Sequence, residues 1–444
     1  MIVATEDTEV IYSPDTYVRG VPHDALARLR RDSPVVWVPE PPIDPWPGGP
    51  GFWSVLRHAD VRQVLRSPGL FSSHLGATQI RDPATPADLA YVRRMMLNMD
   101  PPEHSRLRAL LAKAFTPRAV ARLVDRIRLR ARGLVDAVVE RGEADFAKEI
   151  AADLPLLTLA DVFGIPEPDR WLMFDWSNRV IGYQDPEYAV SASFDAAGAT
   201  EMGRRATALR PQLGPDGRMP DPRTRAGMPD LYAYAHELGE FKRRNPGDDV
   251  MSILMQQVDW DGGRVSVEEF ENLFWLFSVA GNETLRNGLP GGMLALLQHP
   301  EQYRRLRDDS GLLGTAVEEM LRWWTPVMHF RRTATGDVEL AGVPIRAGQK
   351  VVVWFSSANR DPEVFDDPDR FDPRRQPGEH LTFGHGPHFC LGAHLAREQM
   401  RALFAAVLER MDHLELAGEP SRLRSNFQNG LKHLPIRWRP RRPA

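Results

Sequence analysis

The strongest chemical signal in the chain is the segment FGHGPHFCLGAHLAR, residues 383–397, which contains the only cysteine, Cys390. Glycines at 384, 386 and 392 permit a tight turn whose backbone amides point inward, and a helix expected to begin at the cysteine adds positive potential. Both effects favour a thiolate over a thiol. Because a thiolate is a soft, strongly donating ligand, the segment indicates a metal bound through Cys390.

Two other interpretations of this cysteine stay open on the residues alone. Zinc is the first, because His385, His388 and His394 lie close by, although no second cysteine is present to complete the usual structural sites. The second is a small buried side chain, which is the commonest fate of a free cysteine. That interpretation leaves the surrounding glycines unexplained.

An acid and an alcohol stand side by side in a second segment, FENLFWLFSVAGNETLRN, which has the composition of an apolar helix. Glu283 and Thr284 would share one turn of that helix, as groups that can move protons must. Gly281 has no side chain and would leave room for something large. Taken alone, a Glu-Thr pair is more typical of a solvent-facing helix surface.

Two further helical segments carry charged pairs at helix spacing. In AVEEMLRWW, Glu319 and Arg322 are three residues apart, and in DPPEHSRLRALL, His104 and Arg108 are four apart. Each pair therefore lies on one helix face. By themselves such pairs are ordinary surface interactions that contribute little stability.

The elements that position these groups are mostly helices. Ser266 and Glu269 have the spacing of a capping box and predict the start of one long helix, in which Pro290 should cause a kink. Near the end of the chain, the Asn-Gly of NGLKHLPIRW predicts a hairpin turn. The sequence thus predicts a mostly α fold with small β-sheets in a single domain covering residues 1–444. Sheet residues are expected at about 34–60, 326–355 and 423–438, and helices at about 100–324 and 390–411.

Composition narrows the class of protein. The 444 residues are 42% hydrophobic with a net charge of −4, so the chain can bury a large core and offers no electrostatic case for binding nucleic acid. The N-terminus lacks the pattern of a signal peptide, and no stretch approaches the roughly 20 apolar residues of a membrane span. We therefore expect a cytoplasmic protein without a membrane anchor.

The segment around Cys390 resembles the haem-binding signature of the cytochrome P-450 family. Phe383, Gly386, His388, Cys390 and Gly392 match its aromatic, glycine and basic positions. The resemblance implies the P-450 fold, haem b as cofactor, and Cys390 as the axial ligand of the iron, a role that favours O–O cleavage. Phe383 would pack beside the thiolate, and His388 would reach a haem propionate.

The same resemblance assigns the other motifs. Ala280, Gly281, Glu283 and Thr284 match the family's oxygen-activating pattern, which implies proton delivery to bound dioxygen, although Leu285 stands where many relatives have a second threonine. Glu319, Arg322 and Arg370 resemble the family's structural Glu-Arg-Arg triad. The remaining propionate partners implied by the resemblance are His104, Arg108 and Arg331, whereas their neighbours Arg106 and Arg332 should point elsewhere.

The implied activity is that of a monooxygenase that hydroxylates an unactivated C–H bond of a steroid, terpenoid or branched lipid, because several segments are similar to actinobacterial enzymes of that kind. Electrons would come from a separate ferredoxin and its reductase. The alternatives are a tailoring enzyme that epoxidises or couples rings of a natural product, a peroxygenase, and a haem sensor without turnover. The expected substrate walls are Met95, Met96, Leu97, Val279, Ala280, Val327, Met328, Phe427 and Gln428.

Overall fold

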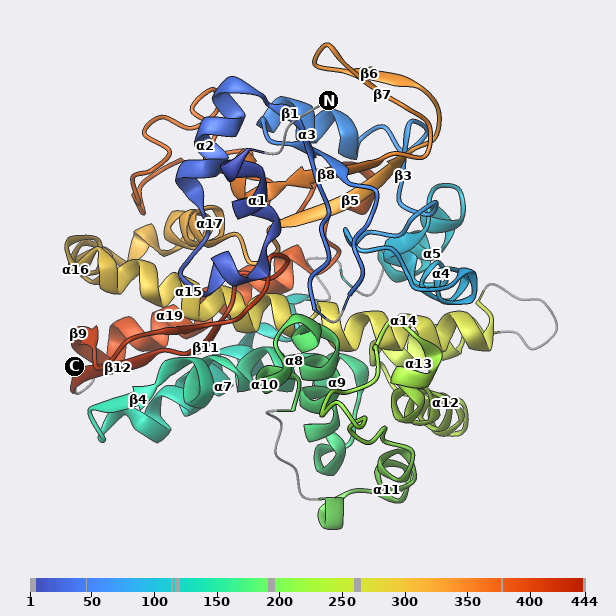
Figure 1. Cartoon of the computed structure of the whole chain (residues 1–444). Helices are drawn as coiled ribbons and strands as arrows, with labels where there is room; N and C mark the ends of the chain where they lie inside the picture. The colour runs from blue at the N-terminus through green and yellow to red at the C-terminus, as the bar shows by residue number, and fades with distance from the viewer. Residues whose placement is uncertain are drawn as a thin grey trace. The chain divides into compact units, whose positions relative to one another are not determined.

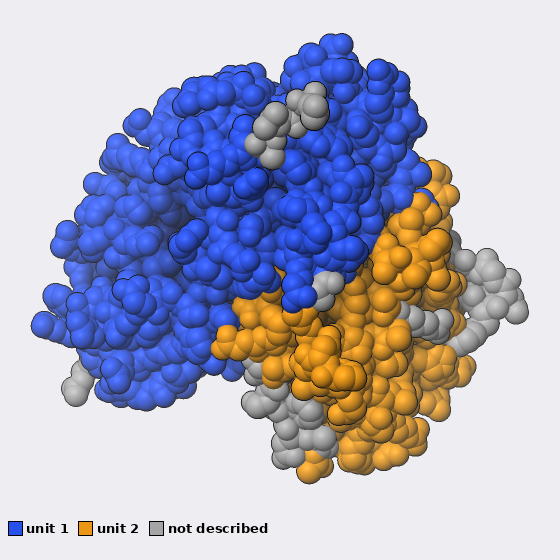
Figure 2. Space-filling view, viewed as in Figure 1, with its two compact units in different colours: residues 1–82, 120–154, 284–444 blue, residues 83–119, 155–283 orange. Residues whose placement is uncertain are grey.

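The computed structural model describes residues 5–44, 46–112, 115, 120–190, 196–258, 265–376 and 378–441. Helices dominate it, and the strands form one five-stranded sheet and three smaller ones (Figure 1). This confirms the predicted mostly α fold with small sheets. Contacts divide the chain into two compact units, with residues 1–82, 120–154 and 284–444 in unit 1 and residues 83–119 and 155–283 in unit 2 (Figure 2).

Unit 1 contains every strand of the described residues and roughly half of the helices. Its helices are α1 (Glu6–Tyr12), α2 (His23–Asp32), α3 (His58–Leu65), α7 (Val124–Val139), α15 (Glu283–Gln298, from Thr284 onward), α16 (Pro300–Asp308), α17 (Leu313–Trp324), α18 (Phe355–Ala358) and α19 (Ala393–Arg410). Its strands are β1 (Val35–Val38), β2 (Phe52–Val55), β3 (Phe71–Ser72), β4 (Glu143–Asp145), β5 (His329–Ala334), β6 (Val338–Leu340), β7 (Val343–Ile345), β8 (Lys350–Trp354), β9 (Met411–Leu416), β10 (Ser421–Arg422), β11 (Leu431–His433) and β12 (Pro435–Pro440).

The five-stranded sheet has the order β1-β2-β8-β5-β3, and within it only β2 and β8 are parallel. Its central strand β8 is an apolar run because both faces are covered. Val351 and Val353 belong to one core cluster, whereas Val352 and Trp354 belong to the other. The alternation of side chains along a strand produces this division and fixes the register of β5, which follows α17 and carries Arg331.

The described residues of unit 2 are almost entirely helical. The helices are α4 (Pro86–Val92), α5 (Glu103–Ala112), α8 (Asp153–Phe163, from Pro155 onward), α9 (Trp171–Ile181), α10 (Pro186–Ala189), α11 (Glu201–Ala208), α12 (Pro229–Arg244), α13 (Val250–Met255) and α14 (Val267–Ala280). A buried ion pair joins α9 to α12, because Arg179 contacts Asp230, which also accepts a hydrogen bond from Trp176 at 2.9 Å. These contacts fix the position of α9, which is important for the site described below.

The long helix predicted after Ser266 begins as expected but does not run unbroken. The side chain of Ser266 accepts from the backbone of Glu269 and the Glu269 side chain accepts in return, so the capping box is confirmed. However, α14 ends at Ala280 and α15 begins at Glu283, whereas Pro290 lies inside α15. The break therefore occurs at the glycine of the AGNET motif and not at the proline.

The hairpin predicted from Asn-Gly is also different in detail. β11 pairs with β10 across a loop that spans residues 423–430, and β12 pairs with β4 and β9. Asn429 does not form a two-residue turn because its side-chain amide donates to the Trp324 carbonyl, while the Trp324 indole donates to the Asn429 backbone carbonyl at 2.8 Å. Tertiary contacts with α17 thus override the local turn preference. Among the described residues, no helix is both long enough and apolar enough to cross a membrane.

Candidate active site

The loop before α19 presents the lone thiol. Gly384 and Gly386 both have φ of +70°, a conformation that favours glycine, and a Cβ on Gly386 would lie only 2.6 Å from the Leu65 carbonyl oxygen. The Cys390 amide donates to the Phe383 carbonyl at 2.8 Å, which closes the loop, and the cysteine itself is exposed. The helix begins at Ala393, three residues later than expected, and nothing crowds the position of a Cβ at Gly392.

A charged cluster supports this loop from α17 and α19. Arg397 lies over the Phe383 ring at 4.4 Å from its centre and forms two hydrogen bonds to Glu318, of 2.6 and 2.8 Å. Glu318 also contacts His380 at 3.0 Å. Burial opposes ionisation of Glu318, but the hydrogen bonds from His380 and Arg397 outweigh it and lower the pKa of this carboxyl to about 2. The cluster holds the predicted aromatic neighbour of the thiol in place.

The predicted propionate partners of unit 1 differ in their contacts. His388 is half-buried, with its Nε2 3.3 Å from the Ser73 hydroxyl. Arg331 is buried, is ion-paired with Asp82 and donates to the Ile80 carbonyl at 3.2 Å. Because Asp82 already neutralises this guanidinium, its contacts do not favour a role toward a propionate. Arg332 is also buried, and strand alternation places its side chain on the opposite face of β5.

Helix α5 in unit 2 carries the other two predicted partners. His104 is buried and Arg108 half-buried on one face, as the i, i+4 spacing predicted. Arg106, expected to point elsewhere, is exposed and ion-paired with Glu269 at the start of α14. The expectation that the Arg106 side chain points away from His104 and Arg108 agrees with this ion pair.

The end of α14 exposes two small residues within an apolar helix. Ala280 and Gly281 are exposed, whereas Val279 and Asn282 on either side are buried. Gly281 is also a packing position, because a Cβ there would lie 2.9 Å from a methyl group of Leu159 on α8. A larger residue at 281 would therefore require the end of the Leu159 side chain to move.

Glu283 is completely buried, and both of its carboxylate oxygens accept hydrogen bonds from hydroxyl groups of unit 2. Ser177 on α9 donates to Oε2 at 2.9 Å, and Tyr188 on α10 donates to Oε1. Thr284, the next residue, is half-buried. The acid of the predicted acid-alcohol pair is thus held in the protein interior and not on a solvent-facing surface.

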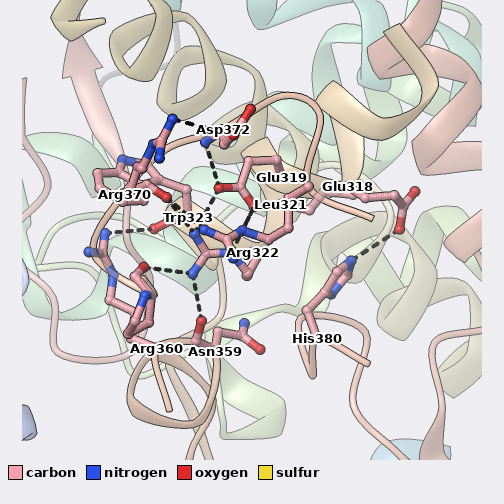
Figure 3. Close-up of polar contacts among 12 residues, drawn as sticks. Glu318, Glu319, Leu321, Arg322, Trp323, Asn359, Arg360, Arg370, Asp372 and His380 are labelled. Atoms are coloured by element: carbon pink, nitrogen blue, oxygen red, sulfur yellow. Dashed lines mark hydrogen bonds and ion pairs between the residues drawn. The ribbon is translucent and has the colours of Figure 1, made fainter. Parts of the chain in front are cut away.

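The Glu-Arg helix α17 forms a saturated ionic lock, shown in Figure 3. Arg322 donates twice to Glu319, at 2.7 and 2.8 Å, and once to the Asn359 carbonyl at 2.8 Å. The third member is Arg375, whose Nε donates to Glu319 at 3.1 Å. The prediction of Arg370 was wrong: its exposed side chain lies nearest Asp372, and only its backbone carbonyl faces Arg322.

The expected substrate walls assemble separately in each unit. In unit 1, Val327 and Gln428 form a β-bridge, and the Met328 amide donates to the Phe427 carbonyl at 2.9 Å. The Met328 side chain is completely buried in a hydrophobic core cluster. In unit 2, the turn around Met95, Met96 and Leu97 packs against α14, in which Val279 is buried. Of that turn, Met95 and Met96 are buried and Leu97 is half-buried.

Comparison with known proteins agrees with this geometry. Residues 236–438 match the family described as Cytochrome P450. A putative cytochrome P450 126 of Mycobacterium tuberculosis is 40% identical over 427 residues, which cover 96% of each chain. This degree of similarity over both whole chains is decisive. The chain belongs to the cytochrome P450 family.

Other members of the family show the same relation. A steroid C26-monooxygenase of Mycobacterium tuberculosis is 37% identical, with 97% of this chain and 93% of that protein covered, and a linalool 8-monooxygenase of Pseudomonas putida is 37% identical, with 96% and 97% covered. The crystal structure of CYP108D1 from Novosphingobium aromaticivorans matches with a TM-score of 0.81 at 31% identity, covering 99% of this chain and all of that one. This P450 is accordingly a monooxygenase that acts on hydrophobic substrates with O₂.

The residues of this P450 fit the haem b that its family binds. The thiol of Cys390 is exposed on a loop closed by its own amide, so its sulfur can act as a ligand. The zinc alternative finds no support in the described ranges, which contain no group of three His, Cys, Asp or Glu residues able to hold a metal ion. A single thiolate donor is sufficient as the protein ligand of a haem iron, whereas a zinc site needs three or four protein ligands.

Sequence reasoning missed three residues of this P450 that contact the predicted acids Glu283 and Glu319. Ser177 and Tyr188 lie about a hundred residues before Glu283, and an isolated serine or tyrosine in a helix carries no signal of its partner. Arg375 stands in FDPRR, five residues after Arg370, so the meander offered several arginines at similar positions. Only the tertiary fold distinguishes them.

Proposed function

We propose that this P450 hydroxylates an unactivated C–H bond of a steroid, terpenoid or branched lipid. The relatives named for steroid and linalool oxidation support this substrate class. The observation that carries the reaction type is the buried carboxyl of Glu283 directly before Thr284, since hydroxylation with O₂ requires protons delivered inside the protein. The methionines and valines expected as walls suit a hydrophobic guest.

We further propose the residues that hold haem. Cys390 would supply the thiolate ligand, Phe383 would pack beside it, and Ala280 with only a methyl group and Gly281 with no side chain would leave room for the cofactor. His104, Arg108 and His388 would bind the propionates. Arg332 would take the role first expected for Arg331, because the Arg331 guanidinium is already ion-paired with Asp82. When bound, the haem supplies oxygen activation, and a thiolate ligand favours O–O cleavage.

The electrons are proposed to come from a separate ferredoxin and its reductase. Cys390 is the only cysteine of the chain, so these 444 residues cannot ligate an iron–sulfur cluster through several cysteines.

A second proposed role belongs to Thr284, whose hydroxyl would hydrogen-bond water or oxygen in the active site while Glu283 provides the proton.

The test is spectroscopic first and catalytic second. The reduced, carbon-monoxide-bound spectrum of the purified protein should show a thiolate-type Soret band that is absent from a Cys390→Ser variant. Cholesterol, linalool and a branched fatty acid should then be compared for substrate-induced spectral shifts, followed by product analysis with a surrogate ferredoxin system and NAD(P)H. Oxygen consumption without product from any of the three would contradict the substrate class, and a normal Soret band without oxygen consumption would indicate a sensor.

A further inference from the structure

Two hydroxyl groups donate hydrogen bonds to the Glu283 carboxylate. Its relative exposure is 0%, that of Ser177 is 0% and that of Tyr188 is 6%, so all three residues of this group are buried. Each carboxylate oxygen has its own donor, Ser177 for Oε2 and Tyr188 for Oε1. The two donors come from different helices, α9 and α10, which pack against each other. The arrangement therefore depends on the tertiary fold.

The backbone around Tyr188 fixes the direction of its side chain. Asp185 caps α10 by accepting from the Tyr188 amide at 3.2 Å. Gly182, in the turn before α10, lies so close to Ala189 that a Cβ would be 2.6 Å from the Ala189 nitrogen. Because the turn and the helix are pressed together, the tyrosine ring has little freedom to leave the carboxylate.

A hydroxyl partner differs chemically from a cationic one. An arginine can only donate, and a buried ion pair fixes the charge of the acid. A serine or tyrosine hydroxyl both donates and accepts, so it can give a proton to the carboxylate and take another from a further donor. A completely buried acid that must deliver protons repeatedly needs neighbours of this second kind, because water cannot reach it directly.

We propose that Ser177 and Tyr188 form the proton relay that recharges Glu283. The inference rests on the proposed role of Glu283 in proton delivery. When Glu283 gives up its proton toward Thr284, a hydroxyl hydrogen of Tyr188 or Ser177 moves to the carboxylate, and that hydroxyl oxygen regains a proton that comes ultimately from solvent water. One O–H bond breaks and one forms at each step, one proton moves inward, and no electrons are transferred.

The experiment is a double-mutant cycle on the haem-loaded enzyme. Tyr188→Phe, Ser177→Ala, Glu283→Gln and Tyr188→Phe/Glu283→Gln are compared for peroxide released per NAD(P)H consumed and for the solvent isotope effect, using whichever of cholesterol and linalool gives the larger spectral shift. Tyr232→Phe is the matched control, because its hydroxyl lies in the same unit but donates to Asn272 at 2.9 Å. An unchanged Soret band and melting temperature establish that each variant is folded.

The relay predicts that Tyr188→Phe raises peroxide release by roughly tenfold or more and Ser177→Ala by less, with a larger solvent isotope effect in both. In the Glu283→Gln background, Tyr188→Phe should have no further effect, because both changes interrupt one path. The infrared band of the Glu283 carboxyl, assigned from the Glu283→Gln difference spectrum, should shift in Tyr188→Phe and not in Tyr232→Phe.

Two results would overturn the relay. The first is normal coupling in Tyr188→Phe while Glu283→Gln is uncoupled, which leaves the proposed function intact and removes only the relay. The second is an equal effect of Tyr188→Phe with and without Glu283, which would mean that the tyrosine acts by another route. Normal coupling in Glu283→Gln itself would instead contradict the proposed role of the acid, and with it the relay.

Discussion

Two buried glutamates of this P450 have nearly the same exposure and opposite surroundings. Glu319 on α17 is surrounded by guanidinium groups, with Arg322 bonded twice and Arg375 once, and it also accepts from the Asp372 amide at 3.0 Å. Glu283 accepts from the hydroxyls of Ser177 and Tyr188. The difference teaches that burial alone does not define the role of an acid, because the chemistry of its partners also matters. Guanidinium groups can only donate, whereas hydroxyl groups both donate and accept.

The physical basis of this contrast is the balance between desolvation and pairing. A buried carboxylate next to arginines is stabilised as an anion, and removing one partner leaves an unpaired charge in the interior. The hydroxyl groups of Ser177 and Tyr188 are uncharged, and each can both donate and accept a hydrogen bond. Glu319 is therefore suited to holding the fold together, and Glu283 has the hydroxyl neighbours that its proposed role in proton delivery would use.

The largest expected effect follows from breaking the lock. Arg322→Met removes the bidentate partner of Glu319 and the donor to the Asn359 carbonyl, leaving an incompletely paired carboxylate. We expect the free energy of unfolding to fall by about 3–5 kcal/mol. Urea unfolding followed by tryptophan fluorescence measures it. A loss below about 1 kcal/mol would show that Arg375 alone satisfies Glu319, and would weaken the contrast between the two acids.

The second prediction exchanges each acid for its amide. Glu283→Gln keeps an oxygen that accepts from a hydroxyl, so its free energy of unfolding should change by about 1 kcal/mol or less. Its coupling of oxygen to product should nevertheless be largely lost. Glu319→Gln should do the reverse, with a loss of several kcal/mol in stability, about 3 kcal/mol or more, because two arginines lose their counter-charge. Equal stability losses in both variants would contradict the comparison.

The third prediction separates two arginines of the meander that follows α18. Arg375→Ala removes a direct donor to Glu319 and should lower the free energy of unfolding by about 1–3 kcal/mol. Arg370→Ala is the matched control, because its exposed side chain is 3.8 Å from Asp372 and such surface pairs contribute about 0–1 kcal/mol. The reverse order in urea unfolding would restore Arg370 as the third member of the lock.

The sequence predicted the groups that act through local spacing. Glu319 with Arg322, the capping box of Ser266 and Glu269, and the side-chain separation of Arg106 from its neighbours all depend on positions within one helical turn, where periodicity determines the geometry. The glycine turn before Cys390 belongs to the same class, because its backbone conformation is encoded by the glycines themselves.

Groups that depend on contacts between distant segments could not be predicted in this way. Arg331 was chosen over Arg332 by position in a motif, but the pairing of Asp82 with β5 decides which guanidinium is already neutralised. The side chain that a Cβ at Gly281 would meet is that of Leu159 on α8, and no property of the AGNET segment reveals this neighbour. In both cases the neighbouring side chain comes from a residue far away in the sequence.

The smallest predicted effect concerns a third acid that lies between these two extremes. Glu318 is bonded to the Arg397 guanidinium and to the His380 imidazole, and its pKa is lowered to about 2 from an ordinary value of 4.5. A carboxyl with a lowered pKa in the folded state stabilises the protein at a pH above its unfolded value, and this contribution is lost as the pH falls through the folded value.

Glu318→Gln should therefore be less stable than the wild type at neutral pH, and the difference in the free energy of unfolding should shrink as the pH falls from about 4.5 toward about 2. Glu398→Gln, which disrupts a half-buried i, i+3 pair with Arg401 on α19, serves as the control and should change stability by less than about 1 kcal/mol throughout. A difference between wild type and Glu318→Gln that stays constant across this range would mean that His380 and Arg397 position the side chain without stabilising its charge.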